Sequence, residues 1–508
     1  MESAPNYAEP EFVRLQRPLE IFRLRGTKVP LHPRERWLVG LVTAHLVLLP
    51  WAIGGRPLWT QFASLAFALV GFIAALIPRD YAAELAENGV PFRLVMWPKL
   101  VRFPLFWIGL AFVAYVAAQG LNPAWEFQED SSSWWTTKVP FHAWLPSGVR
   151  APLERGGAWR GLLVYASIWL TLSTLWVGFT RRRALQFLLT AIAVNGFVLA
   201  VVGIVQKVKP NGLLLWFYKS PNDAFFSSFI YKNHAGAFLN LTLVIACALG
   251  GWHYLRSLRR LDKSSPAGLF VFLATAISIA VLVSFSRGAT LVMLVFLLAA
   301  IAGFVREQIR TPDMLRRNIV LGALLLLFGY FMKNGYDALQ SHEAEAWRRI
   351  HQVADGSDRS LAERRLVTLA SLDMLQDTWP RGVGTGAWSL RFLAYQKNYP
   401  EILVDADDHG KQVFWPHAHN DILQFPIELG LAGTGLLLLG AAWIGVRLVR
   451  LYFWQNPLSL TLVLGLVGTL VHAWFDFVFQ LSSVLLLFSL LLLAALQWAQ
   501  MEASGQRA

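Results

Sequence analysis

Long apolar runs alternate with short polar connections along most of the chain, from Trp37 to Trp498. A run of about 20 apolar residues is long enough for an α-helix to cross a hydrocarbon layer of about 30 Å. A helix also satisfies its backbone hydrogen bonds within itself, as a segment in lipid must. The pattern therefore predicts an all-α integral membrane protein with about twelve membrane-spanning helices. We expect these helices at residues 37–53, 58–77, 103–119, 160–179, 184–206, 234–251, 268–285, 289–305, 318–333, 430–447, 457–475 and 479–497.

Basic residues give the predicted helices a direction across the membrane. They cluster in alternate short connections, at residues 79–102, 181–183, 256–263, 306–317 and 447–450. Connections rich in Lys and Arg stay on the cytoplasmic side. We therefore expect both termini in the cytoplasm. The net charge of +13 then indicates topology, and we predict no nucleic-acid partner.

Composition supports the same class of protein. Only 15% of the residues are charged and 55% are hydrophobic, which excludes an ordinary soluble enzyme of several domains. Cys247 is the single cysteine and lies inside an apolar run, so an intrachain disulfide is excluded. The first 36 residues are polar and rich in arginine. We expect the first membrane helix, and not a cleaved signal peptide, to direct insertion.

The longest polar connection predicted to face outward covers residues 334–417. Within it, Ser360 and Glu363 have the spacing of a capping box, which predicts a helix that ends before Trp379 and Pro380. A folded loop of this length usually carries function. The predicted parts are a basic cytoplasmic arm at residues 1–36, transmembrane helices 1–9 at 37–333, the large outer loop at 334–417, a re-entry segment with transmembrane helices 10–12 at 418–497 and a cytoplasmic tail at 498–508.

The densest polar cluster on the predicted outer side lies at the end of this loop and contains His417, His419, Asn420 and Asp421. A histidine can accept a proton from a hydroxyl near neutral pH, and Asn420 or Asp421 can fix its orientation. Two other interpretations stay open. These groups cap the start of a helix, or they bind a metal together with residues 407–409. Two histidines are too few for a closed zinc site, and we predict neither a metal nor a cofactor.

A second polar cluster, residues 284–290, interrupts two apolar runs at the predicted outer surface. It contains Arg287, whose charge near hydrocarbon costs free energy and therefore suggests a partner. A guanidinium binds phosphate oxygens with two parallel hydrogen bonds, so a lipid-linked phosphate or diphosphate is a natural ligand. The alternative is that Arg287 extends to ordinary lipid headgroups.

Other polar and aromatic residues on the outer side carry weaker signals. Residues 382–386 are rich in glycine, but no strand precedes them, so a turn is favoured over a nucleotide site. Tryptophans in the first outer loop can stack on sugar rings, yet the membrane interface is the favoured interpretation. The further candidate binding residues are Lys232, Asn233, Arg364, Arg365 and Arg381, and the tryptophans are Trp125, Trp134, Trp135 and Trp144.

Together these segments resemble the O-antigen ligase family, bacterial membrane enzymes that also include O-antigen polymerases and protein O-oligosaccharyltransferases. The resemblance covers roughly residues 160–497 and is most specific at His419-Asn420-x-x-Leu423-Gln424 beside the large loop. In the family an Arg commonly precedes the Asn motif, whereas this chain has Lys219 and Lys232 there. The matching stretches are residues 231–239, 285–289, 377–386, 419–424 and 428–433.

The resemblance implies a fold similar to the C-type glycosyltransferase superfamily, with a multi-pass protein in the bacterial inner membrane and a periplasmic active site. It implies an inverting, metal-independent transfer of a glycan from undecaprenyl diphosphate to an acceptor hydroxyl. His419 would be the general base, and Arg287 would neutralise charge on the departing diphosphate. The expected partners are the lipid-linked glycan donor, a lipid A-core or growing glycan acceptor, and membrane lipids. The residues expected to bind diphosphate or glycan are Arg365, Arg364, Lys232, Asn233, Arg381, Asn420 and His417.

Several functions compete on the sequence alone. A ligase acting on lipid A-core in lipopolysaccharide biosynthesis is favoured, with an O-antigen or exopolysaccharide repeat-unit polymerase close behind because the donor is the same. A solute transporter would place ionisable residues or broken helices near the middle of the bilayer and would show inverted halves. The charges lie mainly at the ends of the predicted helices, which disfavours a transporter.

Overall fold

The computed structural model describes residues 31–81, 92–260, 264–309, 359–403 and 413–506. In this part of the chain most residues are helical, and nine helices are long and apolar enough to cross a membrane. Two further expected spans correspond to α1, whose first turn is charged, and to the shorter α8. The structure therefore confirms a mostly helical protein with many apolar helices. The span expected at residues 318–333 lies outside the described residues.

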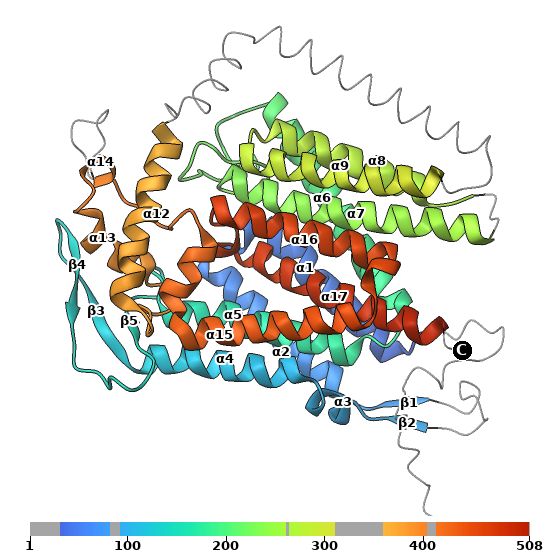
Figure 1. The fold of residues 1–508 in the computed structure, drawn as a ribbon, viewed down its shortest axis with the longest axis horizontal. Helices are drawn as coiled ribbons and strands as arrows, with labels where there is room; N and C mark the ends of the chain where they lie inside the picture. The colour runs from blue at the N-terminus through green and yellow to red at the C-terminus, as the bar shows by residue number, and fades with distance from the viewer. Residues whose placement is uncertain (1–30, 82–91, 261–263, 310–358, 404–412, 507–508) are drawn as a thin grey trace, which may run out of the picture.

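The helices form one bundle with their axes roughly side by side (Figure 1). Every expected span within the described residues falls on one of them. The helices are α1 (Pro33–Trp51), α2 (Leu58–Leu76), α4 (Pro104–Leu121), α5 (Ala158–Gly178), α6 (Arg182–Val208), α7 (Lys232–Arg260), α8 (Ala267–Val283), α9 (Arg287–Ile309), α15 (Asp421–Arg450), α16 (Pro457–Phe475) and α17 (Ser482–Gln506).

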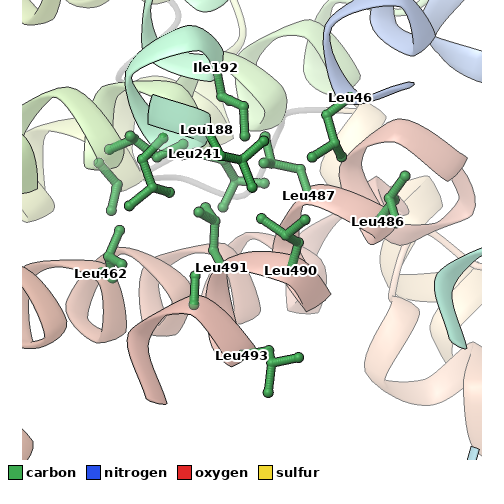
Figure 2. Close-up of a cluster of buried hydrophobic side chains, with 14 of the residues drawn as sticks. Leu46, Leu188, Ile192, Leu241, Leu462, Leu486, Leu487, Leu490, Leu491 and Leu493 are labelled. Carbon is green, nitrogen blue, oxygen red and sulfur yellow. The ribbon is translucent and has the colours of Figure 1, made fainter. Parts of the chain in front are cut away.

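Helices α7 and α17 lie at the centre of the bundle, and most of their apolar residues are buried. Leucines from α1, α6, α7, α16 and α17 meet there in one apolar cluster (Figure 2). Gly465 allows a close approach, because a Cβ at this position would overlap the side chain of Val244. Helices in lipid associate through such close packing, since lipid tails are as apolar as the side chains. By contrast, α9 is mostly exposed and presents its leucines to the lipid.

A small subdomain covers one end of the bundle (Figure 1). It has its own core around Trp388, Met374 and Ile402, all of them fully buried. The other end carries α3 (Trp97–Val101) and a two-stranded antiparallel sheet, β1 (Arg79–Tyr81) with β2 (Phe92–Leu94). The subdomain consists of α12 (Arg359–Thr378), α13 (Trp388–Gln396), α14 (Pro400–Leu403) and a three-stranded sheet in the order β4-β3-β5, with β3 (Pro123–Glu129), β4 (Trp134–Lys138) and β5 (Gly148–Arg150).

The fold is mostly helical, as expected, and the first outer loop adds a small sheet in which β3 pairs antiparallel with β4 and parallel with β5. Two expectations about helix bounds need correction. The tenth expected span, residues 430–447, is the second part of α15, which begins at Asp421 and is kinked at Gly430. Helix α12 ends at Thr378 as expected, but Ser360 lies inside it, so Ser360 is not its cap.

Candidate active site

Asp476 is the centre of the most connected polar group at the subdomain end of the bundle. It follows α16 directly and is 2% exposed. One carboxylate oxygen, Oδ1, lies 3.6 Å from Nδ1 of His419 and accepts a hydrogen bond of 2.9 Å from the backbone of Phe477. The other, Oδ2, accepts a hydrogen bond from Asn233 and lies 3.8 Å from Nη1 of Arg364. Three other segments of the chain, which carry Asn233, Arg364 and His419, therefore converge on one carboxylate.

His419 owes its position to the helix that follows it. Asn420 is the N-cap of α15, and its side chain accepts a hydrogen bond of 3.1 Å from the backbone of Leu423. The backbone of His419 has a φ of 52°, in the left-handed region, which turns the chain sharply before the cap. The capping interpretation is thus right for Asn420. Capping and a chemical role for His419 are compatible, because the cap holds the imidazole against Asp476.

The electrostatics favour a neutral His419 beside an ionised Asp476. Burial lowers the pKa of His419 below its usual value of 6.5, although Asp476 opposes this shift. Burial alone would raise the pKa of Asp476, but His419 and Arg364 hold that pKa well below its usual range. A separation of 3.6 Å exceeds a hydrogen bond. Nδ1 of His419 accordingly has no hydrogen-bond partner among the described residues.

An aromatic ring organises the histidines of the site. The ring of Phe477 stacks on His417 with centroids 4.7 Å apart and on Tyr231 at 5.2 Å. The imidazole of His419 meets the same ring edge-on at 4.6 Å. Burial holds the pKa of His417 well below its usual value, with further lowering from the positive charge of Arg56. His417 is therefore a neutral packing neighbour of the site at neutral pH.

Asn233 links the second polar cluster to Asp476. Its side-chain oxygen accepts a hydrogen bond of 2.7 Å from Ser286, and its amide donates to Asp476 and to the hydroxyl of Tyr231. Arg287, the residue after Ser286, is exposed and begins α9. Hydrogen bonds through Asn233 thus link the segment that carries Arg287 to Asp476, which lies beside His419.

The other expected basic residues divide into two groups. Arg364 is held by the protein, because it donates to the Tyr231 hydroxyl at 3.2 Å and to the Phe475 carbonyl at 3.3 Å. Lys232 is the first residue of α7 and is partly buried. Arg365 and Arg381 are exposed and form no contact with Asp476 in the part of the chain that the structure describes.

The glycine-rich segment 382–386 is a turn whose backbone is hydrogen-bonded to α15. The backbone N–H groups of Val383 and Gly384 donate to the carbonyls of Ile427 and Glu428. The carboxylate of Glu428 accepts hydrogen bonds from the backbone of Gly386 at 2.8 Å and from the amide of Gln424 at 2.9 Å. The turn interpretation is confirmed, and the turn supports the part of α15 that carries the cap.

Three residues of the site were not selected from the sequence. Asp476, Tyr231 and Phe477 hold His419 and Asn233 in place. Asp476 gave a signal, since it is the only acidic residue between positions 457 and 497 and lies at the end of an apolar run. An ionisable residue in such a place is a functional candidate by default.

The metal interpretation finds no ligand group among the described residues. No group of three or more His, Cys, Asp or Glu side chains within the described ranges is placed to hold a metal ion, and residues 407–409 lie outside those ranges.

The tryptophans of the first outer loop differ in their surroundings. Trp134 stacks on Phe127, and Arg391 lies 3.4 Å from the ring centre of Trp125. Trp125 and Trp134 are therefore partly buried against the core of the subdomain, whereas Trp144 is exposed.

Comparison with known proteins adds one finding. Residues 268–438 match the family model described as O-Antigen ligase. The matched segment includes α9 with Arg287, α12 with Arg364, and the turn and cap around His419. No curated protein matches the chain.

Proposed function

We propose, from the O-antigen ligase family domain that the chain carries at residues 268–438, that the protein is a membrane glycosyltransferase. It moves a glycan from undecaprenyl diphosphate to an acceptor hydroxyl, with lipid A-core as the first candidate acceptor. The observation that carries the proposal is the buried pair of His419 and Asp476 at the end of the bundle. An enzyme of this kind needs a base at the acceptor and a cation at the leaving group.

His419 acts as the general base in this proposal. Its lowered pKa leaves the imidazole neutral near pH 7, as a base must be. Nδ1 faces the Asp476 carboxylate, which favours a proton on that nitrogen and leaves Nε2 to accept the proton of the hydroxyl. The imidazolium that forms is stabilised by the negative charge of Asp476. The hydroxyl oxygen then attacks the anomeric carbon, with inversion and without a metal.

Arg287 neutralises the charge that develops on the departing diphosphate. It stands at the start of α9, where the free backbone N–H groups of the helix add positive potential. Ser286 ties this helix start to Asn233 and so to Asp476. Base and cation would then act on opposite sides of the same anomeric carbon.

The remaining basic and polar residues bind or position. Lys232, Arg365 and Arg381 are the candidate contacts for diphosphate or glycan, since all three lie at the same end of the bundle. Asn233 and Arg364 hold Asp476, Asn420 caps the helix that follows His419, and His417 packs on Phe477, the ring that His419 also contacts. These four residues affect substrates through the groups that they position.

The site faces the periplasm in this proposal, with the protein in the inner membrane and both termini in the cytoplasm. An enzyme whose active site faces the periplasm has no access to the sugar nucleotides of the cytoplasm. A glycan activated by a lipid diphosphate is therefore a suitable donor.

The test is transfer from an undecaprenyl-diphosphate glycan by purified protein, with lipid A-core and a lipid-linked repeat unit offered as separate acceptors. We expect labelled product on lipid A-core, and we expect His419→Ala to lower the rate by about 10²-fold to 10⁴-fold. The matched control is His142→Ala, at an exposed histidine of the first outer loop. Lengthening of the lipid-linked chain instead would identify a polymerase. Solute flux in proteoliposomes without transfer to either acceptor would identify a transporter.

A further inference from the structure

A pocket is lined by residues of α3 and β2 and by the ends of two long helices. Helix α3 and strand β2 lie at the end of the bundle away from the subdomain (Figure 1). The volume of the pocket is about 130 Å³. The ends of α5 and α17 close it on the other sides. The lining residues that matter are Lys99, Trp176, Phe179, Gln497, Gln500 and Met501. The pocket therefore combines one cationic side chain, Lys99, with mostly apolar walls.

The carboxylate of Glu35 acts electrostatically on Lys99, but its oxygens are already hydrogen-bonded to other groups. Glu35 accepts 2.6 Å and 2.7 Å hydrogen bonds from Arg79 and the Thr180 hydroxyl on one oxygen, and a 2.9 Å bond from the Thr180 backbone on the other. Arg79 and Glu35 are both fully buried and neutralise each other. The pocket therefore keeps the uncompensated positive charge of Lys99.

Lys99 has an aromatic neighbour but no carboxylate. Its ammonium nitrogen lies 5.9 Å from the ring centre of Trp176, and it forms no ion pair within the described ranges of the chain. Burial lowers the pKa of Lys99 to about 8, so the group stays mostly protonated at neutral pH. A partly desolvated cation with a free hydrogen-bonding capacity suits an anionic ligand.

The surroundings of the pocket identify the kind of ligand. Val95, Trp97 and Val101 are exposed apolar residues in and beside the short helix that carries Lys99. Tryptophan in this position is typical of the layer of lipid headgroups. The pocket has space for several water-sized groups, so it has room for a phosphate with its ester bonds. The remainder of a lipid can extend along the exposed apolar residues.

We propose that this pocket binds an anionic phospholipid, with the phosphate at Lys99 and the apolar part of the lipid against Trp176, Phe179 and Met501. Basic pockets between membrane helices are known to take such headgroups. A free phosphate ion would use the cation but not the apolar walls. The inference is independent of the transfer reaction, because the pocket lies at the other end of the bundle.

Lipid binding to the full-length purified protein tests the proposal by native mass spectrometry. Phosphatidylglycerol and phosphatidylcholine are titrated separately, and inorganic phosphate forms a third arm. We expect the wild type to retain phosphatidylglycerol in preference to phosphatidylcholine. Lys99→Met should weaken retention of phosphatidylglycerol about fivefold, as expected for one lysine contact, while Lys99→Arg should preserve it.

The matched control is Arg102→Met, which removes a charge from an exposed residue of the same segment outside the pocket. It should retain phosphatidylglycerol as the wild type does. Equal retention of the two lipids by the wild type would overturn the proposal, whether or not the variants fold. Equal loss in Arg102→Met and Lys99→Met would also overturn it, because surface charge would then explain the preference. Competition by millimolar inorganic phosphate would indicate an ion site in place of a lipid site.

Discussion

Asp476 is buried among groups that donate to it or carry positive charge. Asn233 and the Phe477 backbone donate hydrogen bonds to its carboxylate, Arg364 brings a positive charge to 3.8 Å, and His419 lies at 3.6 Å. A buried carboxylate without such partners would protonate. Its ionised state is therefore maintained by the same residues that fix its position. This arrangement allows Asp476 to stabilise a positive charge that forms on His419.

Replacement of Asp476 by Asn removes the charge and keeps the shape. We expect Asp476→Asn to lower kcat by about 10²-fold or more, since the imidazolium would lose its counter-ion. The measurement is the steady-state rate of glycan transfer by protein that elutes as the wild type does. Asp130→Asn, in an exposed turn, is the control and should leave the rate unchanged. A rate close to that of the wild type in Asp476→Asn would exclude this role.

The pH dependence of kcat/KM should report the ionisation of His419. The base is active only when neutral, so activity is lost as pH falls through its pKa. Burial places this pKa below 6.5, so we expect kcat/KM to rise on the acid side and to level off before neutral pH. Asp476 raises the pKa of His419, so Asp476→Asn should move the acid limb to still lower pH. The profile is measured over about pH 5 to 8. A limb centred above 6.5, or moved upward by the substitution, would contradict the assignment.

The rate of glycan transfer should depend on both the charge and the planar shape of the Arg287 guanidinium. We expect Arg287→Ala to lower kcat/KM by about 10²-fold, the usual loss for one group that stabilises charge in a transition state. Arg287→Lys should recover part of the rate, because an ammonium keeps the charge but cannot bind two phosphate oxygens in parallel. Arg306, in the last turn of the same helix, is the matched control, and Arg306→Ala should retain full activity. Equal activity of Arg287→Ala and Arg306→Ala would exclude the role of Arg287 at the leaving group.

Sequence reasoning identified some residues of the site but not their shared partner. His419 and Asn233 were selected as polar residues at the ends of apolar runs, and Arg364 was selected as a basic residue on the predicted helix of the outer loop. All three converge on Asp476. Asp476 is distant from each of them in the chain. Only packing of α16 beside α7 and α15 reveals the contact. A pattern along one segment carries no information about which segments meet.

Helix α15 combines the cap, a kink and a membrane span in one element. The kink at Gly430 has φ 60° and ψ −167°, a conformation that is open essentially to glycine alone. The carbonyl oxygens of Pro380 and Arg381 approach so closely that a Cβ would overlap them. The turn after α12 is thereby fitted to the kink. This contact fixes the direction from which the cap and His419 enter the site.

A methyl group at the kink should disturb this fit. We expect Gly430→Ala to lower the free energy of unfolding by about 3 kcal/mol, from backbone strain and the clash with the turn. Transfer activity should fall as well, since the turn also holds Glu428. Gly435→Ala is the matched control in the same helix, because a Cβ at Gly435 would meet nothing within 4 Å. Thermal unfolding of both variants in the same detergent is the measurement. Equal melting temperatures would show that the kink tolerates a side chain.

The elements were predictable where one physical signal dominates. Apolar runs located every expected helix within the described residues, because length and hydropathy alone determine a span. The start of α15 was missed, since Pro426 and Gly430 interrupt the apolar pattern while the helix continues from Asn420. The strands of the first outer loop were missed because they are short and pair across a hairpin. Such pairing depends on contacts that no local pattern specifies.

The whole molecule separates its charges between two ends. The starts of α7, α9 and α15 meet the end of α16 at the candidate site. The opposite end gathers the three arginines at the start of α6, residues 181–183, and the arginines in the last turns of α7, α9 and α15. An uncharged helix bundle would have no preferred direction in a membrane. The positive-inside rule therefore predicts that the basic end lies in the cytoplasm.

This polarity predicts which end each reagent can reach. Cys247 is the only cysteine, so a variant without it accepts single reporter cysteines. We expect Ser132→Cys, in the exposed β3–β4 turn, to react in intact cells with a maleimide that crosses the outer but not the inner membrane. Arg183→Cys, exposed in the first turn of α6, should react only after the inner membrane is opened. The reverse pattern would place the His419 and Asp476 pair in the cytoplasm, among sugar nucleotides. A lipid-linked donor would then no longer be required, and the proposed reaction would lose its main chemical reason.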